Sequence, residues 1–200
     1  MSNSRPAIRP TKIILWVVLY LPAIGLMSGY FSGKLLSGEL LHPTGEFSAR
    51  LMIIAMMATP LLVLFQRLGW SLRVPHWLVR HRRAFGVAAF VYAALHTVFY
   101  LADVGAWSKI IDDLKSVGIW TGWLAFAIFI PLAITSNDRS QRWLKATWKK
   151  LQRWVYPAAV LTLLHWIFVH NDIGPALVHF VPLALLELFR IYSYYFPSKG

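Results

Sequence analysis

The sequence predicts an all-α integral membrane protein, a bundle of six transmembrane helices with both termini in the cytoplasm. Hydrophobic residues make up 58% of the 200 residues and charged residues only 14%, and the mean hydropathy is +0.55, which is too apolar for a soluble domain of this length. The apolar residues are grouped into runs long enough to cross a bilayer. The stretches between these runs alternate between basic and neutral or acidic.

Each apolar run has roughly the 17 to 25 residues that a helix needs to cross the hydrocarbon core. Lipid offers no hydrogen bonds to the backbone, and these runs lack the alternation of barrel strands, so they are predicted to be helices. No internal repeat is visible. The six predicted spans run from Ile13 to Phe31, from Phe47 to Phe65, from Ala84 to Ala102, from Val117 to Thr135, from Trp154 to Val169 and from Ala176 to Tyr195.

The basic residues predict the orientation, because cytoplasmic loops of membrane proteins concentrate Lys and Arg. They gather in the N-terminal segment and in the loops before the third and fifth spans. Residues 1–12 are therefore expected to form a cytoplasmic segment, residues 13–195 the transmembrane domain and residues 196–200 a cytoplasmic tail. The basic residues are Arg5, Arg9 and Lys12, then Arg67, Arg73, Arg80, Arg82 and Arg83, then Arg139, Arg142, Lys145, Lys149, Lys150 and Arg153.

The composition also excludes several functions. A formal charge of +12 suggests nucleic acid in a soluble protein, but here the charge lies between apolar spans, so nucleic-acid binding is not expected. The absence of cysteine excludes disulfides, iron–sulfur clusters, thiolate-bound metals and covalently attached c-type haem. Any haem must therefore be held by histidine.

Two histidines, His96 and His165, lie deep inside the third and fifth predicted spans. A titratable ring is costly in hydrocarbon unless its nitrogens are occupied, so an intramembrane histidine is a candidate functional residue. Both spans run outward, and each histidine lies seven residues before an outer aspartate, Asp103 or Asp172. The two rings are therefore expected at the same depth in the outer half of the membrane, where they could hold a metal between two helices.

The preferred interpretation is that His96 and His165 are the axial ligands of a b-type haem iron. Small residues on the same predicted helix faces, Gly86, Ala89 and Ala93 before His96 and Ala158 and Thr162 before His165, leave room for a flat macrocycle or a close helix neighbour. Zinc is disfavoured because it needs three or four ligands. His170 and His179 are reserves near span ends. The alternatives are core histidines hydrogen-bonded across helices, or steps of a proton relay.

Three further charged residues fall within the predicted spans. Arg50 is four residues from Glu46, so it either forms an i,i+4 ion pair or donates to a haem propionate. Glu187 and Arg190 are three residues apart and are expected to pair, although Glu187 could carry a quinone-linked proton. The sequence suggests no catalytic residue.

Several segments resemble a known family. The words HPTGEFSAR, RHRRAFG leading into AALHTVFY, ITSN, and WKKLQRWVYPAAVLTLLHW are similar to those of haem-binding membrane subunits of periplasmic methionine sulfoxide reductase systems, the MsrQ type within the ferric-reductase-like transmembrane superfamily. The resemblance covers nearly the whole chain. It implies a six-helix b-type cytochrome of the bacterial inner membrane. The implied donor is quinone or reduced flavin, with FMN as a further cofactor, and the implied acceptor is a periplasmic molybdenum-containing reductase that repairs oxidised proteins.

One position departs from the family pattern. The family typically carries another histidine about 13 residues before the second ligand, where this chain has Gln152. A glutamine amide is a poor iron ligand, so a second, inner haem is doubtful. His76 or His81 could substitute on one side; otherwise flavin or quinone would bind near the inner face. The basic residues available there are Arg80, Arg82, Arg83 and Arg153.

Two other functions stay open. A stand-alone transmembrane metal reductase of the ferric-reductase type would use the same haem but deliver electrons to a small oxidant. A haem-free transporter or channel would use the histidines to shuttle protons.

Overall fold

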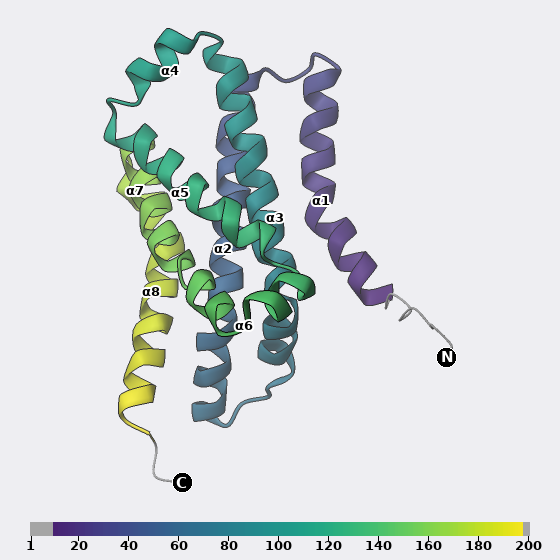
Figure 1. Cartoon of the computed structure of the whole chain (residues 1–200), viewed down its shortest axis with the longest axis vertical. Helices are drawn as coiled ribbons and strands as arrows, with labels where there is room; N and C mark the ends of the chain where they lie inside the picture. Colours follow the sequence, from purple (N-terminus) through teal and green to yellow (C-terminus); the bar gives the residue numbers. More distant parts are fainter. Residues whose placement is uncertain (1–9, 198–200) are drawn as a thin grey trace.

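The computed structural model describes residues 10–197, which form eight α-helices and no β-strand (Figure 1). The two longest, α2 and α3, lie side by side over their length, and α5 packs against α7. The helix α8 lies along α2, and α1 stands at the side of the bundle. The helices are α1 (Pro10–Phe31), α2 (Ser37–Leu68), α3 (Arg73–Val104), α4 (Trp107–Asp113), α5 (Val117–Ile134), α6 (Asp138–Gln152), α7 (Val155–His170) and α8 (Ile173–Tyr195).

Five of these helices, α1, α2, α3, α5 and α8, are long and apolar enough to cross a membrane. The all-helical prediction is thus confirmed for the described residues. The fifth predicted span corresponds to α7, which is apolar but has only 16 residues, about 24 Å of helix at 1.5 Å per residue. The six-span count and the position of the termini stay predictions.

The helices α2 and α3 contain the second and third predicted spans and extend well beyond them. The helix α2 begins at Ser37 rather than Phe47, and α3 begins at Arg73 rather than Ala84. The stretch from Arg73 to Arg83, predicted to be a loop, is therefore helical. Hydropathy marks where the chain meets hydrocarbon, whereas a helix continues until something ends it. Pro75 lies in the first turn of α3, where proline is tolerated.

Two helices lie outside the predicted spans. The short α4 exposes Trp107 and Ile111, and the basic, amphipathic α6 is kinked at Lys145, whose φ is 48°. The Trp148 indole attaches α6 to α5 by donating to the Thr135 carbonyl at 2.9 Å. Both helices lie in charged segments that were predicted to be loops.

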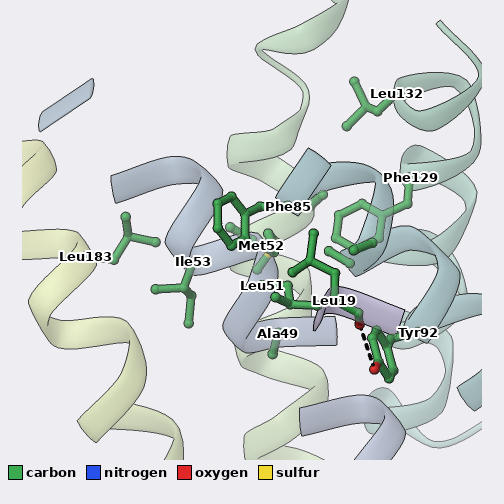
Figure 2. Close-up of a cluster of buried hydrophobic side chains, with 14 of the residues drawn as sticks. Leu19, Ala49, Leu51, Met52, Ile53, Phe85, Tyr92, Phe129, Leu132 and Leu183 are labelled. Atoms are coloured by element: carbon green, nitrogen blue, oxygen red, sulfur yellow. Dashed lines mark hydrogen bonds between the residues drawn. The ribbon is translucent and has the colours of Figure 1, made fainter. Parts of the chain in front are cut away.

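Small side chains allow the central helices to approach closely. Ala58, Ala88 and Ala158 are fully buried, and Ala49 and Ala89 almost so. Such residues are typical of helix contacts in membranes, where close backbone packing replaces the hydrophobic effect. The larger side chains of the core fill the space around these contacts (Figure 2).

A buried tyrosine attaches α1 to the bundle. The Tyr92 hydroxyl, on α3, donates to the Leu19 carbonyl of α1 at 3.0 Å (Figure 2). It also accepts from the Ala23 amide of α1 at 3.0 Å. These two groups belong to the turn that contains Pro22. Proline distorts a helix and weakens its hydrogen bonding, so the hydroxyl supplies partners at the turn that needs them.

Candidate functional site

A cavity of about 450 Å³ lies among α2, α3, α5 and α7 and extends to α4. Its volume is in the range of sites that bind small molecules or cofactors, about 300–1,000 Å³. The walls in the interior of the bundle are small or aromatic, and polar side chains gather at the α4 end. The apolar walls include Ala49, Ala93, Ala125, Phe126 and Phe129; the polar group, here called the mouth, consists of His42, Glu46, Tyr100, Asp103, Lys109, Asp113 and His170.

His96 of α3 and His165 of α7 face each other across this cavity. Their ring centres are 5.9 Å apart and their ring planes are nearly perpendicular, at 85°. The structure thus brings together the two histidines that were predicted to lie at the same depth in the membrane. Their role as ligands stays a prediction.

Each ring is oriented by a backbone carbonyl. Nδ1 of His96 lies 2.9 Å from the Leu41 oxygen of α2, and Nδ1 of His165 lies 2.6 Å from the Gly118 oxygen of α5. A carbonyl oxygen can only accept, so each Nδ1 carries the proton and donates it. In a neutral imidazole the other nitrogen, Nε2, then has a free lone pair. This is the arrangement in which proteins prepare a histidine to bind a metal.

The pair suits a metal bound between two imidazoles. An imidazole nitrogen binds a transition metal at about 2.0–2.1 Å, so two ligands on opposite sides of one ion have their nitrogens about 4 Å apart. The ring centres lie farther out, which is compatible with the observed 5.9 Å. Residues 10–197 contain no group of three or more His, Cys, Asp or Glu side chains arranged to hold an ion, so a closed zinc site is not supported there.

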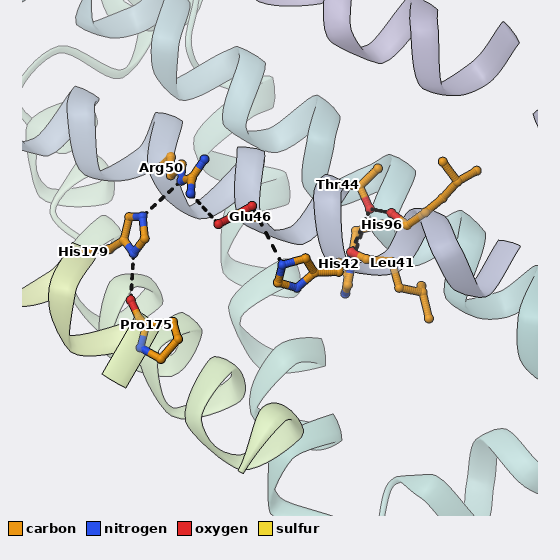
Figure 3. A network of polar contacts seen from close by, with 9 residues as sticks. Leu41, His42, Thr44, Glu46, Arg50, His96, Pro175 and His179 are labelled. Carbon is orange, nitrogen blue, oxygen red and sulfur yellow. Dashed lines mark hydrogen bonds and ion pairs between the residues drawn. The ribbon is translucent and has the colours of Figure 1, made fainter. Parts of the chain in front are cut away.

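Arg50 does not line the cavity. It forms the predicted ion pair with Glu46, and its Nε donates to Nε2 of His179 on α8 at 3.1 Å (Figure 3). His179 in turn donates from Nδ1 to the Pro175 carbonyl at 2.7 Å. His179 therefore joins α8 to α2 and lies apart from the cavity lining.

The second predicted ion pair is also present. Nη2 of Arg190 lies 2.8 Å from Oε2 of Glu187 and donates to the Tyr156 hydroxyl at 2.9 Å. Both residues lie outside the cavity lining.

The basic residues predicted to bind flavin or quinone lie at the opposite end of α3 from the mouth. Arg83 pairs with Asp138 and donates to Gln141 of α6 at 3.0 Å, while Arg82 and Arg153 are exposed. Hydrogen bonding to the Arg83 guanidinium holds the pKa of the Asp138 carboxyl below its ordinary value. None of the three arginines lines the cavity.

The residues considered for a second haem have other partners. Nε2 of Gln152 donates to the Leu132 carbonyl and the Thr135 hydroxyl of α5, both at 3.2 Å. Nδ1 of His81 donates to the Trp77 carbonyl at 2.8 Å, and His76 is exposed. No side chain in this group reaches the cavity.

The interpretation of Gly86 is wrong. It was expected to share a helix face with His96, but it is exposed and has no atom near enough to touch an added Cβ. The rotation of α3 turns it away from the cavity. Ala93 does line the cavity, and Ala89 is buried, with its carbonyl accepting from the Ser48 hydroxyl at 2.9 Å.

Sequence reasoning missed a second histidine pair at the mouth. The rings of His42 on α2 and His170 on α7 are 5.2 Å apart, and Nε2 of His42 lies 3.9 Å from Oε2 of Glu46. It also missed Gly45 and Gly122, which lie against the rings of His96 and His165. One signal was available: the dipeptide Thr-Gly occurs at positions 44–45 of α2 and 121–122 of α5. These are the two helices whose carbonyls bind His96 and His165.

Fold and site together define a multi-pass helical membrane protein with two histidines facing each other in a cavity inside the bundle. The chain belongs to the family described as ferric reductase like transmembrane component, whose model matches residues 44–163. The match includes His96 and ends two residues before His165.

The similar proteins are bacterial. The chain is 36% identical over 159 residues to the protein-methionine-sulfoxide reductase heme-binding subunit MsrQ of Xanthomonas campestris pv. campestris (strain 8004), covering 78% of this chain and 69% of that one. It is 30% identical over 208 residues to the protein of the same name from Caulobacter vibrioides, covering 96% and 95%. No solved structure matches significantly. The chain is thus a multi-pass bacterial membrane protein.

Proposed function

We propose that this protein is a b-type haem subunit that passes electrons across the bacterial inner membrane, from quinone or reduced flavin to a periplasmic methionine sulfoxide reductase. The observation that carries the proposal is the facing pair His96 and His165, each with Nδ1 bonded to a carbonyl and Nε2 left free. The relatives named as haem-binding subunits support it.

The residues of the cavity fit a haem. The neutral imidazoles of His96 and His165 would hold the haem iron, and two such ligands would discourage oxygen binding. Ala93 and Ala49 leave space beside the ligands, while Phe126 and Phe129 give apolar walls for a flat macrocycle. When bound, the haem iron supplies one-electron redox chemistry. The polypeptide holds it in place, excludes water and sets its potential through the apolar walls and the ligand hydrogen bonds.

Partners for the two carboxylates of a haem are few at the mouth, which already holds the carboxylates of Glu46, Asp103 and Asp113. Lys109 is the one lysine or arginine among the described residues that line the cavity, and His42 and His170 add two further nitrogen donors. Arg50 is a second candidate for a propionate, because its partner Glu46 belongs to the mouth. It would have to exchange that ion pair for the propionate.

We assign six spans, with α7 as the fifth, and a single transmembrane domain over residues 13–195. Residues 1–12 and 196–200 would be cytoplasmic. This orientation follows from the basic stretches and turns the mouth and α4 toward the periplasm, where the molybdenum-containing reductase would dock. The electron donor would then approach from the opposite end, near Arg82, Arg83 and Arg153. A flavin such as FMN carries a phosphate, for which the exposed Arg82 and Arg153 are suitable partners.

We expect one haem per chain. Gln152 stands where the family has the histidine thirteen residues before the second ligand, and its side chain already bonds to α5. Arg83, thirteen residues before His96 on α3, already pairs with α6. A pyridine haemochromogen assay with protein quantitation on detergent-purified material should therefore give haem b at a ratio of one.

Other outcomes of this assay discriminate between the alternatives. Two haems per chain would contradict the assignment of Gln152 as a lost site. A colourless protein, expressed with ample haem supply, would reject the haem proposal and favour a transporter. Rapid reduction of ferric chelates by the purified protein, with no molybdoprotein co-purifying, would favour the stand-alone metal reductase.

A further inference from the structure

We propose that Gly45 and Gly122 are positioning residues, which hold the two axial imidazoles of the proposed haem with their planes perpendicular. This inference rests on the proposed function and extends it to residues that never contact the iron. It derives from a set of contacts that occurs twice, once between α2 and α3 and once between α5 and α7; we call this repeated arrangement the structural duplication.

In the first half of the duplication, α2 holds His96. The Thr44 hydroxyl, fully buried, donates to the Leu40 carbonyl at 2.6 Å and lies 3.1 Å from the Leu41 carbonyl. The Leu41 oxygen accepts from Nδ1 of His96 (Figure 3). The next residue, Gly45, lies so close to the imidazole that a Cβ there would be 3.1 Å from Nδ1 and 3.2 Å from Cε1.

The second half repeats this arrangement on α5. The Thr121 hydroxyl, also fully buried, donates to the Val117 carbonyl at 2.7 Å and lies 2.9 Å from the Gly118 carbonyl. The Gly118 oxygen accepts from Nδ1 of His165 at 2.6 Å. A Cβ on Gly122 would lie 2.6 Å from Nδ1 and 2.7 Å from Cε1.

The register of the two halves is identical. In each, the carbonyl that binds the imidazole lies three residues before the threonine and four before the glycine, and a buried alanine, Ala89 or Ala158, lies seven residues before the histidine. The same hydrogen bonds and the same spacings therefore recur on two helix pairs. A chance run of small residues would not reproduce the carbonyl, hydroxyl and imidazole contacts together.

Helix geometry explains why glycine is needed four residues after the carbonyl. The Cα–Cβ bonds of an α-helix tilt toward its N-terminus, so the Cβ of residue i+4 overhangs the carbonyl of residue i. Glycine at that position uncovers the carbonyl oxygen, which can then accept from a ring on the neighbouring helix in addition to its contacts within its own helix. The carbonyls of Leu41 and Gly118 become fixed acceptors, and each imidazole plane is held by its own helix.

The result is the 85° angle between the ring planes. In a low-spin ferric haem with two imidazole ligands, this angle controls the electron paramagnetic resonance spectrum. Nearly parallel planes give a rhombic signal, whereas nearly perpendicular planes give a highly anisotropic signal with a large maximum g-value. The geometry of this protein therefore specifies the second type of spectrum.

The test uses the purified, haem-loaded protein and three glycine-to-alanine variants. The wild type should show the highly anisotropic low-spin signal. Gly122→Ala should lose most of it, to a high-spin or rhombic species, because the added Cβ displaces the His165 ring. Gly45→Ala, where the clash is milder, should keep its haem and show a smaller shift of the maximum g-value. Gly86→Ala, on exposed α3 surface with no atom near the new Cβ, is the matched control and should give the wild-type spectrum.

The outcomes separate this inference from the proposed function. A haem-loaded wild type with a rhombic, parallel-type signal would overturn the inference and leave the haem assignment standing. The same conclusion follows when Gly122→Ala and Gly45→Ala match Gly86→Ala. When Gly122→Ala fails to retain haem, Gly45→Ala decides: a shifted signal supports the inference and an unchanged one rejects it. A wild type without haem rejects both.

Discussion

Replacing either His96 or His165 by alanine is expected to abolish the low-spin b-type haem spectrum. Each imidazole is held by its own carbonyl on a different helix, so the remaining histidine cannot fill both axial positions. The missing imidazole also leaves one position of the iron open to water or oxygen, which changes the spin state. Optical spectra of the reduced and oxidised proteins should lose the sharp α-band, and the haem-to-protein ratio should fall several-fold.

The control for this prediction is His76→Ala, at the exposed start of α3 and away from the cavity. It should give the wild-type spectrum and haem ratio. An unchanged α-band in either His96→Ala or His165→Ala would refute the ligand assignment.

Replacing Tyr92 by phenylalanine is expected to lower the stability of the protein by about 1–3 kcal/mol, the usual cost of a buried polar group that loses its partner. The hydroxyl bonds both the Leu19 carbonyl and the Ala23 amide, and a hydrocarbon environment offers these groups no other partner. Tyr92 is fully buried, so the change removes one oxygen and keeps the shape of the core. Thermal unfolding in detergent should show a lower Tm, and hydrogen exchange should increase first in α1.

Tyr20→Phe is the matched control, because the Tyr20 hydroxyl makes no hydrogen bond within residues 10–197 and its ring stacks on Trp16 of the same helix. It should leave the Tm close to that of the wild type. Equal Tm values for the two variants would mean that the Tyr92 hydroxyl does not hold α1.

The apolar helices could be predicted from the sequence because a bilayer imposes one solution on apolar runs of this length, the α-helix. What could not be read was where each helix stops. The charges from Arg73 to Arg83 end the hydrocarbon-facing segment, but nothing there ends hydrogen bonding along the backbone, so α3 continues through them. The helices α4 and α6 were missed for the same reason, since a polar stretch beside a membrane can be helical.

The two central histidines could be found because depth along a helix is a matter of counting residues. Their supporting residues could not, because contact across helices depends on which helices are neighbours and how each is rotated. Gly86 was assigned to the cavity and is exposed, whereas Gly45 lay outside the predicted spans and touches His96. The pair His42 and His170 was hidden in the same way, by the early helical start of α2.

The hydrogen bonds of Gln152 and Arg83 have a consequence for the speed of the proposed relay. Both residues lie thirteen positions before a central histidine, and Arg83 and His96 share α3, where thirteen residues span about 20 Å along the helix axis. Because Gln152 and Arg83 already contact α5 and α6, the proposed single haem would leave no second carrier at that level. Tunnelling rates fall exponentially with distance, so this insulated stretch would set the turnover of the chain of carriers. The reduced isoalloxazine or quinol ring would have to enter the bundle, not merely touch its cytoplasmic surface.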